Sequence, residues 1–181
     1  MSTQGLELDT GRGELHAVIR EHFRIVEEGD FEAMSDNVTE DFVNIRSAEE
    51  PASARQPGPA GLRATSEWLR RTFADLHFEI HDILINEDRV AARVTMHGRQ
   101  HGSFLVYEDE AGSITEAFPS TGRSLAVHQT HWFRLRDGRI TEHDAVRDDL
   151  GMAKQLKWVP PTPAYLIRML VCRRREQRRQ R

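Results

Sequence analysis

The fold is decided by residues 128–156, HQTHWFRLRDGRITEHDAVRDDLGMAKQL. This stretch predicts two antiparallel strands, a tight turn at residues 136–138 and a short closing helix. Aspartate followed by glycine at the end of a three-residue loop is typical of a type I turn that ends with a glycine in the left-handed region. Such a loop sets Leu135 opposite Arg139, which fixes how the two strands face one another.

The predicted register brings two histidines together. Counting back from the turn, His131 faces His143, and Gln129 faces Ala145. Side chains alternate along a strand, so one face of the hairpin carries imidazoles and apolar groups side by side. The residues of this face are Val127, His131, Phe133, Leu135, His143, Ala145 and Arg147. Two imidazoles among apolar side chains on a concave face predict a functional site.

Length and composition predict one globular domain. The chain has 181 residues, of which 38% are hydrophobic and 30% are charged. This composition is neither that of a disordered chain nor that of a membrane protein, and no stretch approaches the roughly 20 apolar residues that span a bilayer. The first 14 residues lack the basic head and apolar run of a secretory signal. With Cys172 as the one cysteine, no internal disulfide can form, and we expect a cytoplasmic protein.

Charge is distributed unevenly along the chain. The net charge is −4, but residues 173–181, RRREQRRQR, carry six arginines and one glutamate, or +5, so residues 1–172 sum to −9. An acidic body argues against nucleic acid as a partner. The apolar segment 165–172, YLIRMLVC, precedes the arginines. We expect it to dock on the body or to bury itself in a dimer, rather than to bind a membrane.

The remaining sequence predicts helices followed by strands. Apolar residues recur at helical spacing in two segments, and period-2 alternation predicts half-buried strands after the second. Gly98 and Gly102 predict a bulge or bend that lets the sheet curl. The expected elements are a helix at 14–28, a short helix beginning at 31–34, a strand at 41–44, a mobile Pro- and Ala-rich loop at 47–60, a helix at 61–76, strands at 77–86 and 89–107, and an acidic, turn-rich segment at 108–122.

Several motifs together resemble one family. They are His131-Trp132-x-Arg134-x-x-Asp137-Gly138-x-Ile140-x-Glu142-His143, Asp148-Asp149-Leu150-Gly151-Met152, Gln155-Leu156, Glu40-Asp41-Phe42-Val43-Asn44, Phe73-Ala74-Asp75-Leu76, Gly98 with Gly102, and Pro119-Ser120-Thr121-Gly122. On these residues the chain resembles the SnoaL-like polyketide (ester) cyclases of the nuclear transport factor 2-like superfamily. The resemblance covers roughly residues 12–161, and it leaves a flexible N-terminus at 1–11 and a C-terminal extension at 162–181.

The resemblance implies an α+β fold. Its curved, cone-shaped antiparallel or mixed sheet, an α+β barrel, is packed by N-terminal helices around a cavity, and the protein pairs into a homodimer through the sheet. Because this family has a shorter connection at residues 108–122, we interpret that segment as an insertion near the cavity mouth.

The resemblance also implies a reaction. Cyclases of this family close a polyketide ring by an intramolecular aldol reaction without a metal or an organic cofactor. A carboxylate removes a proton from a carbon between two carbonyls, and a histidine or nearby donor stabilises the enolate. His131 matches the family's pocket histidine, but the family's catalytic aspartate falls on Ala145, which accepts no proton. The expected ligand is small and apolar or polyketide-like.

The candidate catalytic residues are therefore His131, His143 and Asp148. His143 is on the required face and has an ordinary pKa near neutrality, although a structural pair with His131 is an equal alternative. Asp148 precedes the closing helix, where capping of backbone N–H groups is its simpler role. The candidate ligand-binding residues are Asn44, Phe42, Arg93, His101, Phe133, Ala145 and Arg147. For His22, packing in the core is the favoured interpretation.

Other chemistry has weaker support. His128 and His131 lie three apart on a strand and so point to opposite faces, although His131, His143 and His101 could converge on a metal if a third strand lies alongside. We expect no metal and no cofactor. Three interpretations remain open: a cofactor-independent enzyme, a non-catalytic small-molecule binding protein with the same cavity, and an oligomerising adaptor. Fold alone does not choose among them.

Overall fold

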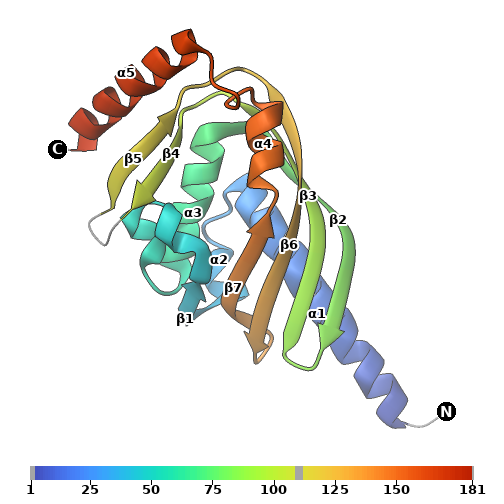
Figure 1. Cartoon of the computed structure of the whole chain (residues 1–181). Helices are drawn as coiled ribbons and strands as arrows, with labels where there is room; N and C mark the ends of the chain where they lie inside the picture. Colours follow the sequence, from blue (N-terminus) through green and yellow to red (C-terminus); the bar gives the residue numbers. More distant parts are fainter. Residues whose placement is uncertain (1–2, 109–111, 181) are drawn as a thin grey trace.

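The computed structural model describes residues 3–108 and 112–180, and for residues 3–12 it describes the backbone alone. Its elements are α1 (Thr3–Glu28), α2 (Met34–Asn37), β1 (Val38–Asn44), the 3-10 helices η1 (Ile45–Glu49) and η2 (Ala52–Arg55), α3 (Pro59–Thr72), β2 (Phe73–Asn86), β3 (Arg89–Gln100), β4 (Phe104–Glu108), β5 (Ser113–Phe118), β6 (Ser124–Arg136), β7 (Arg139–Arg147), α4 (Asp149–Gln155) and α5 (Pro163–Gln180). Figure 1 shows a strongly curved sheet wrapped around α1 and α3.

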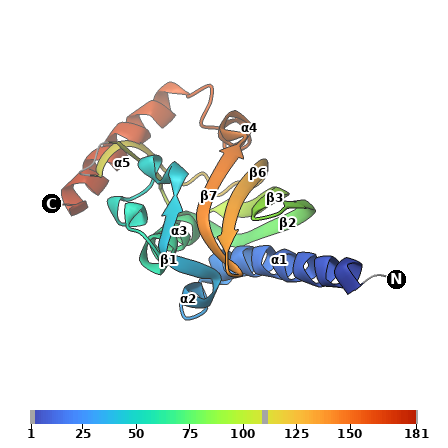
Figure 2. The same cartoon turned by 90° about the horizontal axis from the view of Figure 1, so that it is seen from below.

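The main sheet has five strands in the order β1-β7-β6-β3-β2. Strand β1 runs parallel to β7, whereas the other neighbours are antiparallel. The short strands β4 and β5 form a separate antiparallel pair. Seen from below in Figure 2, the five strands fan out along one side of α1. The predicted α+β fold with a curved mixed sheet is confirmed.

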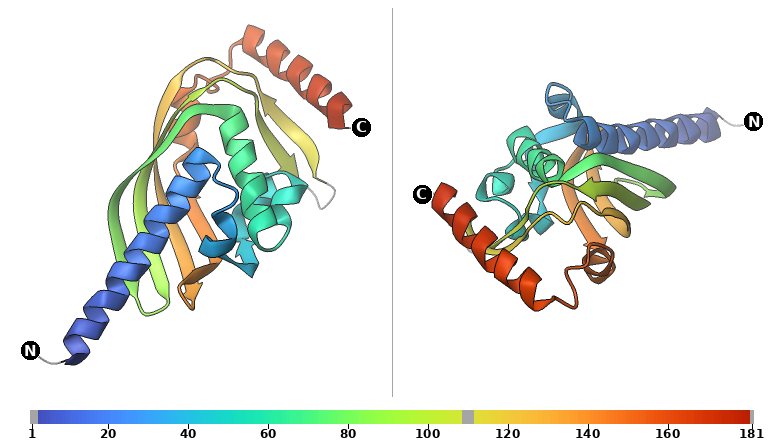
Figure 3. Two further views of the ribbon diagram at one scale, coloured as in Figure 1. Left: turned by 180° about the vertical axis from the view of Figure 1, so that it is seen from behind. Right: turned by 90° about the horizontal axis from the view of Figure 1, so that it is seen from above.

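The core lies between the concave face of this sheet and the helices. Viewed from behind in Figure 3, α1 and α3 both cross that face. Helix α1 buries one apolar stripe that includes Ile19, Phe23 and Val26. The Phe23 ring packs against Phe78 of β2 with the ring centroids 5.1 Å apart. Ile19 and Val26 belong to the stripe that the spacing predicts, whereas Phe23 does not, and α1 begins at Thr3 rather than at Glu14.

Helix α3 is shorter at its end than predicted. It begins where Gly58, at φ +75°, leads into Pro59 at the first helical position, a residue whose fixed φ suits that place. It ends at Thr72, because Phe73 is already extended and pairs with Gln100 of β3. Residues 73–76, the last four of the predicted helix over residues 61–76, therefore belong to β2. Sheet pairing outweighs helix propensity here.

The predicted strand at 89–107 is two strands. Strand β3 ends at Gln100, and the backbone N–H groups of His101 and Gly102 both donate to the Thr72 carbonyl, each at 3.0 Å. This close approach turns the chain into β4. The bend that the glycines predict thus lies at Gly102, whereas Gly98 lies within β3 against Phe73.

The register of the central hairpin differs from the prediction by two residues. Asp137 and Gly138 both have positive φ, at 51° and 74°, so the loop has two residues and Arg136 pairs with Arg139. This is the geometry of a type I′ turn, which matches the strand twist better than the predicted turn. A bulge between Arg134 and Leu135 shifts the register by the second residue. A shift of two keeps every side chain on its predicted face.

The C-terminal segment docks on the body. Helix α5 packs along β5, and side chains from it bond to backbone carbonyls there: Gln177 Nε2 donates to the Ile114 oxygen at 2.8 Å, and the Tyr165 hydroxyl donates to that of Pro119 at 3.2 Å. Of the alternatives for this segment, docking is the one that the structure shows. None of the described helices is long and apolar enough to cross a bilayer.

The acidic segment 108–122 supplies a further strand. Its residues 109–111 lie outside the described part, and the rest includes β5, which pairs with β4 in antiparallel register. The Pro- and Ala-rich segment 47–60, predicted as a mobile loop, is mostly occupied by η1, η2 and the start of α3.

Candidate functional site

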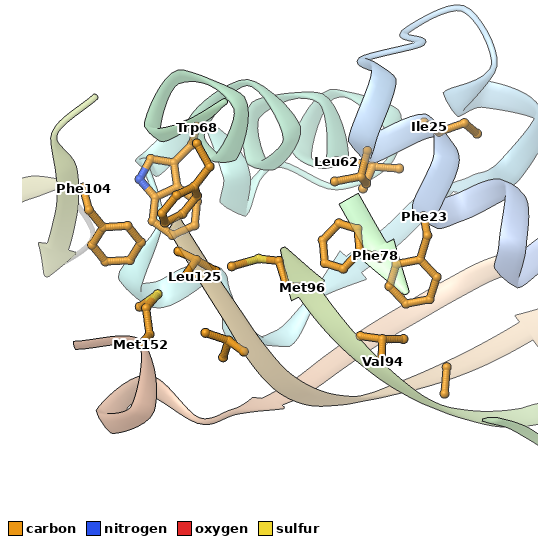
Figure 4. Packing of buried hydrophobic residues seen from close by; sticks show 14 of the residues in the cluster. Phe23, Ile25, Leu62, Trp68, Phe78, Val94, Met96, Phe104, Leu125 and Met152 are labelled. Carbon is orange, nitrogen blue, oxygen red and sulfur yellow. The ribbon is translucent and has the colours of Figure 1, made fainter. Parts of the chain in front are cut away.

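A cavity of about 60 Å³ lies between α3 and the concave face of the sheet. One wall of it is apolar. Figure 4 shows Trp68 beside Phe104, with Met96 and Phe78 farther along. The Trp68 and Phe104 rings are tilted by 48° to each other, with their centroids 5.0 Å apart. The apolar lining is Trp68, Leu69, Phe73, Phe78, Met96, Phe104, Val127, Ala145 and Met152. These side chains create surroundings from which water is largely excluded.

The rest of the lining is polar and is called the polar wall below. Its residues come from β1, η1, α3, β6, β7 and α4, elements that are far apart in the sequence. They are Asn44, Arg46, Glu50, Thr65, Gln129, His131, His143, Arg147 and Asp149. Polar groups that converge on an apolar pocket are the usual composition of a ligand site.

An outer groove continues the cavity toward the surface. Its volume is about 460 Å³, and it shares Phe104, Arg147, Asp149 and Met152 with the cavity. Strands β4 and β5 line its other side. The two spaces together reach the range of about 300–1,000 Å³ that small-molecule sites occupy. The segment 108–122 therefore does border the mouth of the cavity, as predicted.

The two predicted histidines are in contact. The pairing places His131 opposite Ala145 and Phe133 opposite His143, so the imidazoles are diagonal neighbours on one face. His131 Nδ1 lies 2.8 Å from His143 Nε2, and the two rings stack with their centroids 5.1 Å apart. The predicted closeness is correct even though the predicted direct pairing is wrong, because diagonal neighbours also touch across a sheet.

A glutamine orients this pair. His131 Nε2 lies 2.8 Å from Gln129 Oε1, and an amide oxygen can only accept, so His131 donates from Nε2. We infer that His131 Nδ1 then accepts the N–H of His143 Nε2. Both N–H groups of the neutral pair are thereby used within the protein. His143 Nδ1 remains as an acceptor.

Burial keeps the pair uncharged at neutral pH. Desolvation, together with the nearby charges of His22 and Arg147, lowers the pKa of His131 to about 3. Desolvation, with His131, His22 and Arg147 nearby, also puts the pKa of His143 well below its ordinary value. The imidazoles are thus neutral hydrogen-bonding groups at pH 7.

His22 supports the site from behind rather than lining it. Burial lowers its pKa to about 4, and its Nδ1 lies 2.9 Å from Asn37 Oδ1. Its ring meets Phe133 edge-on at 5.2 Å and lies 5.6 Å from His143. This is the core role that the sequence favours.

Arg147 brings a positive charge to the mouth of the cavity. Its side chain is 20% exposed and forms ion pairs with Glu49 at 3.3 Å and with Asp149 at 3.4 Å. It is opposite Gln129 across the hairpin. The guanidinium thus lies between the inner cavity and the outer groove, both of which it lines.

Sequence reasoning missed one carboxylate, Glu50. It follows η1 and is 3% exposed, with its oxygens 2.5 Å from Thr65 Oγ1 and 3.3 Å from Asn44 Nδ2. Desolvation is the largest effect on its pKa, which is raised, with Arg147 among the groups that oppose the rise. In the sequence, Glu49-Glu50 in a polar segment has the pattern of a solvated loop, and no signal marks the second glutamate as buried.

Three of the predicted ligand-binding residues line the cavity: Asn44, Ala145 and Arg147. Asp148 does not. Its Oδ1 accepts the Gly151 backbone N–H at 2.8 Å, so it caps α4, which is the simpler of its two predicted roles.

The other predicted residues lie elsewhere. Arg93 is on the outer face of the sheet, paired with Asp82 at 2.6 Å, because its neighbour Ala92 is the residue that faces His131. His101 lies nine residues beyond Ala92 and bonds to the Arg70 carbonyl, so the suggested three-histidine metal set does not converge. Phe42 and Phe133 are core residues that do not line the cavity, although Phe133 stacks on His143 at 4.9 Å.

Comparison with known proteins decides the family. A family model described as SnoaL-like polyketide cyclase matches residues 16–156. The chain belongs to this family. The SnoaL-like relatives include aklanonic acid methyl ester cyclase DnrD of Streptomyces peucetius, 29% identical over 133 residues, which are 71% of this chain and 83% of that protein. Aklanonic acid methyl ester cyclase DauD of Streptomyces sp. (strain C5) is 31% identical over 107 residues, 59% of this chain and 60% of that protein.

Solved structures agree on the fold of this SnoaL-like protein. TsrD from Streptomyces laurentii superposes with a TM-score of 0.64 at 24% identity, covering 80% of this chain and 96% of that one. The curved α+β architecture that the resemblance implies is thereby confirmed. At this level of identity the likeness extends to the fold and not to the reaction.

Proposed function

We propose that this protein is a cofactor-independent cyclase that closes a ring by an aldol-type reaction on a small, apolar, polyketide-like carbonyl substrate. The observation that carries the proposal is a neutral, hydrogen-bonded His131–His143 pair beside the Arg147 cation on the polar wall of an otherwise apolar cavity. Apolar walls favour a hydrophobic substrate, while the polar wall supplies the few directed contacts that orient it.

Each part of this wall has a chemical role in the proposal. Proton loss from a carbon next to a carbonyl generates an enolate, and the positive charge of Arg147 stabilises the developing oxygen anion. His143 Nδ1 accepts a hydroxyl of the substrate, while Gln129 and His131 hold that imidazole in one tautomer. The dry inner cavity strengthens both interactions, since charges attract more strongly at low dielectric.

The proposed substrate class rests on the relatives. Both named relatives are aklanonic acid methyl ester cyclases. The outer groove and the inner cavity together offer space of the size that such ligand sites have. Aklanonic acid methyl ester is therefore the first compound to test.

Removal of either paired imidazole is expected to abolish most of the turnover. His131→Ala or His143→Ala breaks the series of hydrogen bonds that runs from Gln129 through His131 to His143. The remaining imidazole then has an unsatisfied nitrogen, so the substrate loses its fixed position. Misplacement of this kind costs about 100-fold in rate. The measurement is kcat/KM for aklanonic acid methyl ester, followed by chromatography of the cyclised product.

The matched control is His77→Ala, since the His77 side chain is 63% exposed and lies on β2, away from the cavity. Its rate should equal that of the wild type. If the wild type is active and both site variants keep its rate, the paired imidazoles have no role in the reaction.

One observation favours a second function. Ala145 occupies the position where the resemblance implies a catalytic aspartate, and it lines the cavity opposite His131. A protein without that base can hold the same ligand without converting it. Saturable binding of the ester, seen by quenching of Trp68 fluorescence, with no product after prolonged incubation, would identify a binding protein.

We also propose that two copies pair through the outer face of the sheet. Trp132 and Val146 lie on that face and are 54% and 56% exposed, which is unusual for such large apolar side chains. Trp132→Glu would place a charge in the contact. The expected result is a monomer in sedimentation velocity where the wild type is a dimer, and a wild-type monomer would contradict the pairing.

A further inference from the structure

The buried carboxylate of Glu50 has no explanation in the roles assigned so far. Glutamate is almost never fully buried unless it is paired with a charge. The residues bonded to Glu50 are the neutral Thr65 and Asn44, and its carboxylate forms none of the ion pairs found in the described part of the chain. A buried acid held by neutral donors and facing a cavity is costly for the fold, which suggests a functional role.

We propose that the Glu50 carboxylate is the base that removes the substrate's proton, in place of the aspartate that Ala145 lacks. This inference rests on the proposed function, because it names the group that starts the same reaction. Glu50 lines the cavity together with His131, His143 and Arg147. The base thus comes from the segment between β1 and α3, and not from the β6–β7 hairpin.

The alternatives on the same wall are poorer bases. The depressed pKa values of His131 and His143 mean that neither neutral imidazole readily takes up a further proton near neutral pH. Asp149 pairs with Arg147, and its side chain is 58% exposed. Glu50 combines burial with a raised pKa, which brings a carboxylate closer to the working pH of a general base.

The step balances without any further reactant. At the carbon between two carbonyls, a C–H bond breaks. The proton bonds to a Glu50 oxygen, and the electron pair of the broken bond moves into the enolate. The enolate carbon then attacks the second carbonyl, which forms the C–C bond and leaves an alkoxide. Glu50 returns its proton to that alkoxide and is regenerated. Thr65 and Asn44 hold the carboxylate in place throughout.

The neighbours of Glu50 predict how a substitution changes stability. Thr65, Asn44, Arg147 and Glu49 are the groups that act on it. Because the folded-state pKa of Glu50 is raised, its contribution to stability is present below the unfolded-state value and is lost as the pH rises through the folded pKa. Glu50→Gln keeps the shape and removes the buried charge, so it should stabilise the protein at pH 7.

The test compares Glu50→Gln with Glu50→Asp and with the control Glu67→Gln. Glu67 is a glutamate on α3 whose side chain is 47% exposed and pairs with Arg63. For aklanonic acid methyl ester we expect Glu50→Gln to lower kcat by about 100-fold or more with little change in KM, the usual loss for a general base. Glu50→Asp should recover part of the rate, and the urea midpoint of Glu50→Gln should rise.

A second assay isolates the proton transfer. Deuterium uptake from D₂O at the carbon between the two carbonyls of methyl acetoacetate, followed by proton NMR, needs a base but no ring closure. If the wild type and Glu67→Gln accelerate the exchange and Glu50→Gln does not, the result supports Glu50 as the base. If the same proteins do not cyclise the ester, only the proposed cyclisation is overturned. Exchange at the buffer rate in the wild type, or a Glu50→Gln variant with the wild-type kcat, overturns Glu50 as the base.

Discussion

Acidification from pH 7 to pH 4 is expected to lower the free energy of unfolding by several kcal/mol through His22 and His131. The pKa values of these histidines in the folded protein are about 4 and about 3, against an ordinary value of 6.5. Between these values the unfolded chain takes up protons that the folded chain does not. Stability is therefore present above pH 6.5 and is lost as the pH falls toward the folded-state pKa, by about 3 kcal/mol for each residue.

His143 changes stability in the same direction, because its pKa is also depressed. Glu50 has the opposite effect, since protonation favours its buried state. The histidines outweigh it in number, and His22 and His131 are both buried, at 3% and 6% exposed. A net stability of about 5–15 kcal/mol is typical of a domain, so this loss is enough to unfold the protein near pH 4.

The measurement is urea unfolding followed by circular dichroism at pH 7 and pH 4.5. His22→Gln removes one titrating group while keeping an N–H donor near Asn37 Oδ1, so it should recover about 2 kcal/mol of the difference between pH 7 and pH 4.5. His77→Gln, whose imidazole is 63% exposed, is the control and should recover none. Equal pH dependence in the two variants would show that His22 does not carry the effect.

Gly102→Ala is expected to destabilise the fold by about 3 kcal/mol or more, as overpacked substitutions do when the backbone has to move. A Cβ at this position would lie 2.1 Å from the Arg71 carbonyl oxygen, closer than any contact allows. Relief requires separating β3 from the end of α3, which would break the bonds from His101 and Gly102 to the Thr72 carbonyl.

Gly13→Ala provides the matched control, because an added Cβ there meets no atom within 4 Å. Alanine in a helix interior is about 1 kcal/mol more favourable than glycine, so this variant should be slightly more stable than the wild type. The two urea midpoints should move in opposite directions. A Gly102→Ala midpoint within error of the wild type would mean that the junction of β3 and β4 tolerates a side chain.

The resemblance to a known family predicted the fold class, whereas patterns along the chain were enough to predict the closing helix and the shared face of the two site histidines. The reason is that alternation along a strand depends on backbone geometry alone, so His131 and His143 occupy the same face in any register that differs by an even number of residues. The cap at Asp148 and the apolar stripe of α1 are likewise local properties. Each of these features can be derived from residues close together in the sequence.

Other features depended on contacts between distant segments. The end of α3 at Thr72 follows from pairing of Phe73 with β3, and the turn at Asp137-Gly138 adopts the type that fits the twist of the strands it joins. The outward position of Arg93 and the distance of His101 from the cavity follow from strand pairing in the same way.

Glu50 shows this limit most clearly. Nothing in Glu49-Glu50 distinguishes a buried carboxylate from a solvated one, because burial depends on what covers it. Thr65 on α3 and Asn44 on β1 bond to the carboxylate, and Arg147 on β7 acts on its charge. Local sequence sets which way a side chain points, whereas the protonation state and hydrogen-bond partners of a buried group are set by residues that only the folded chain brings near.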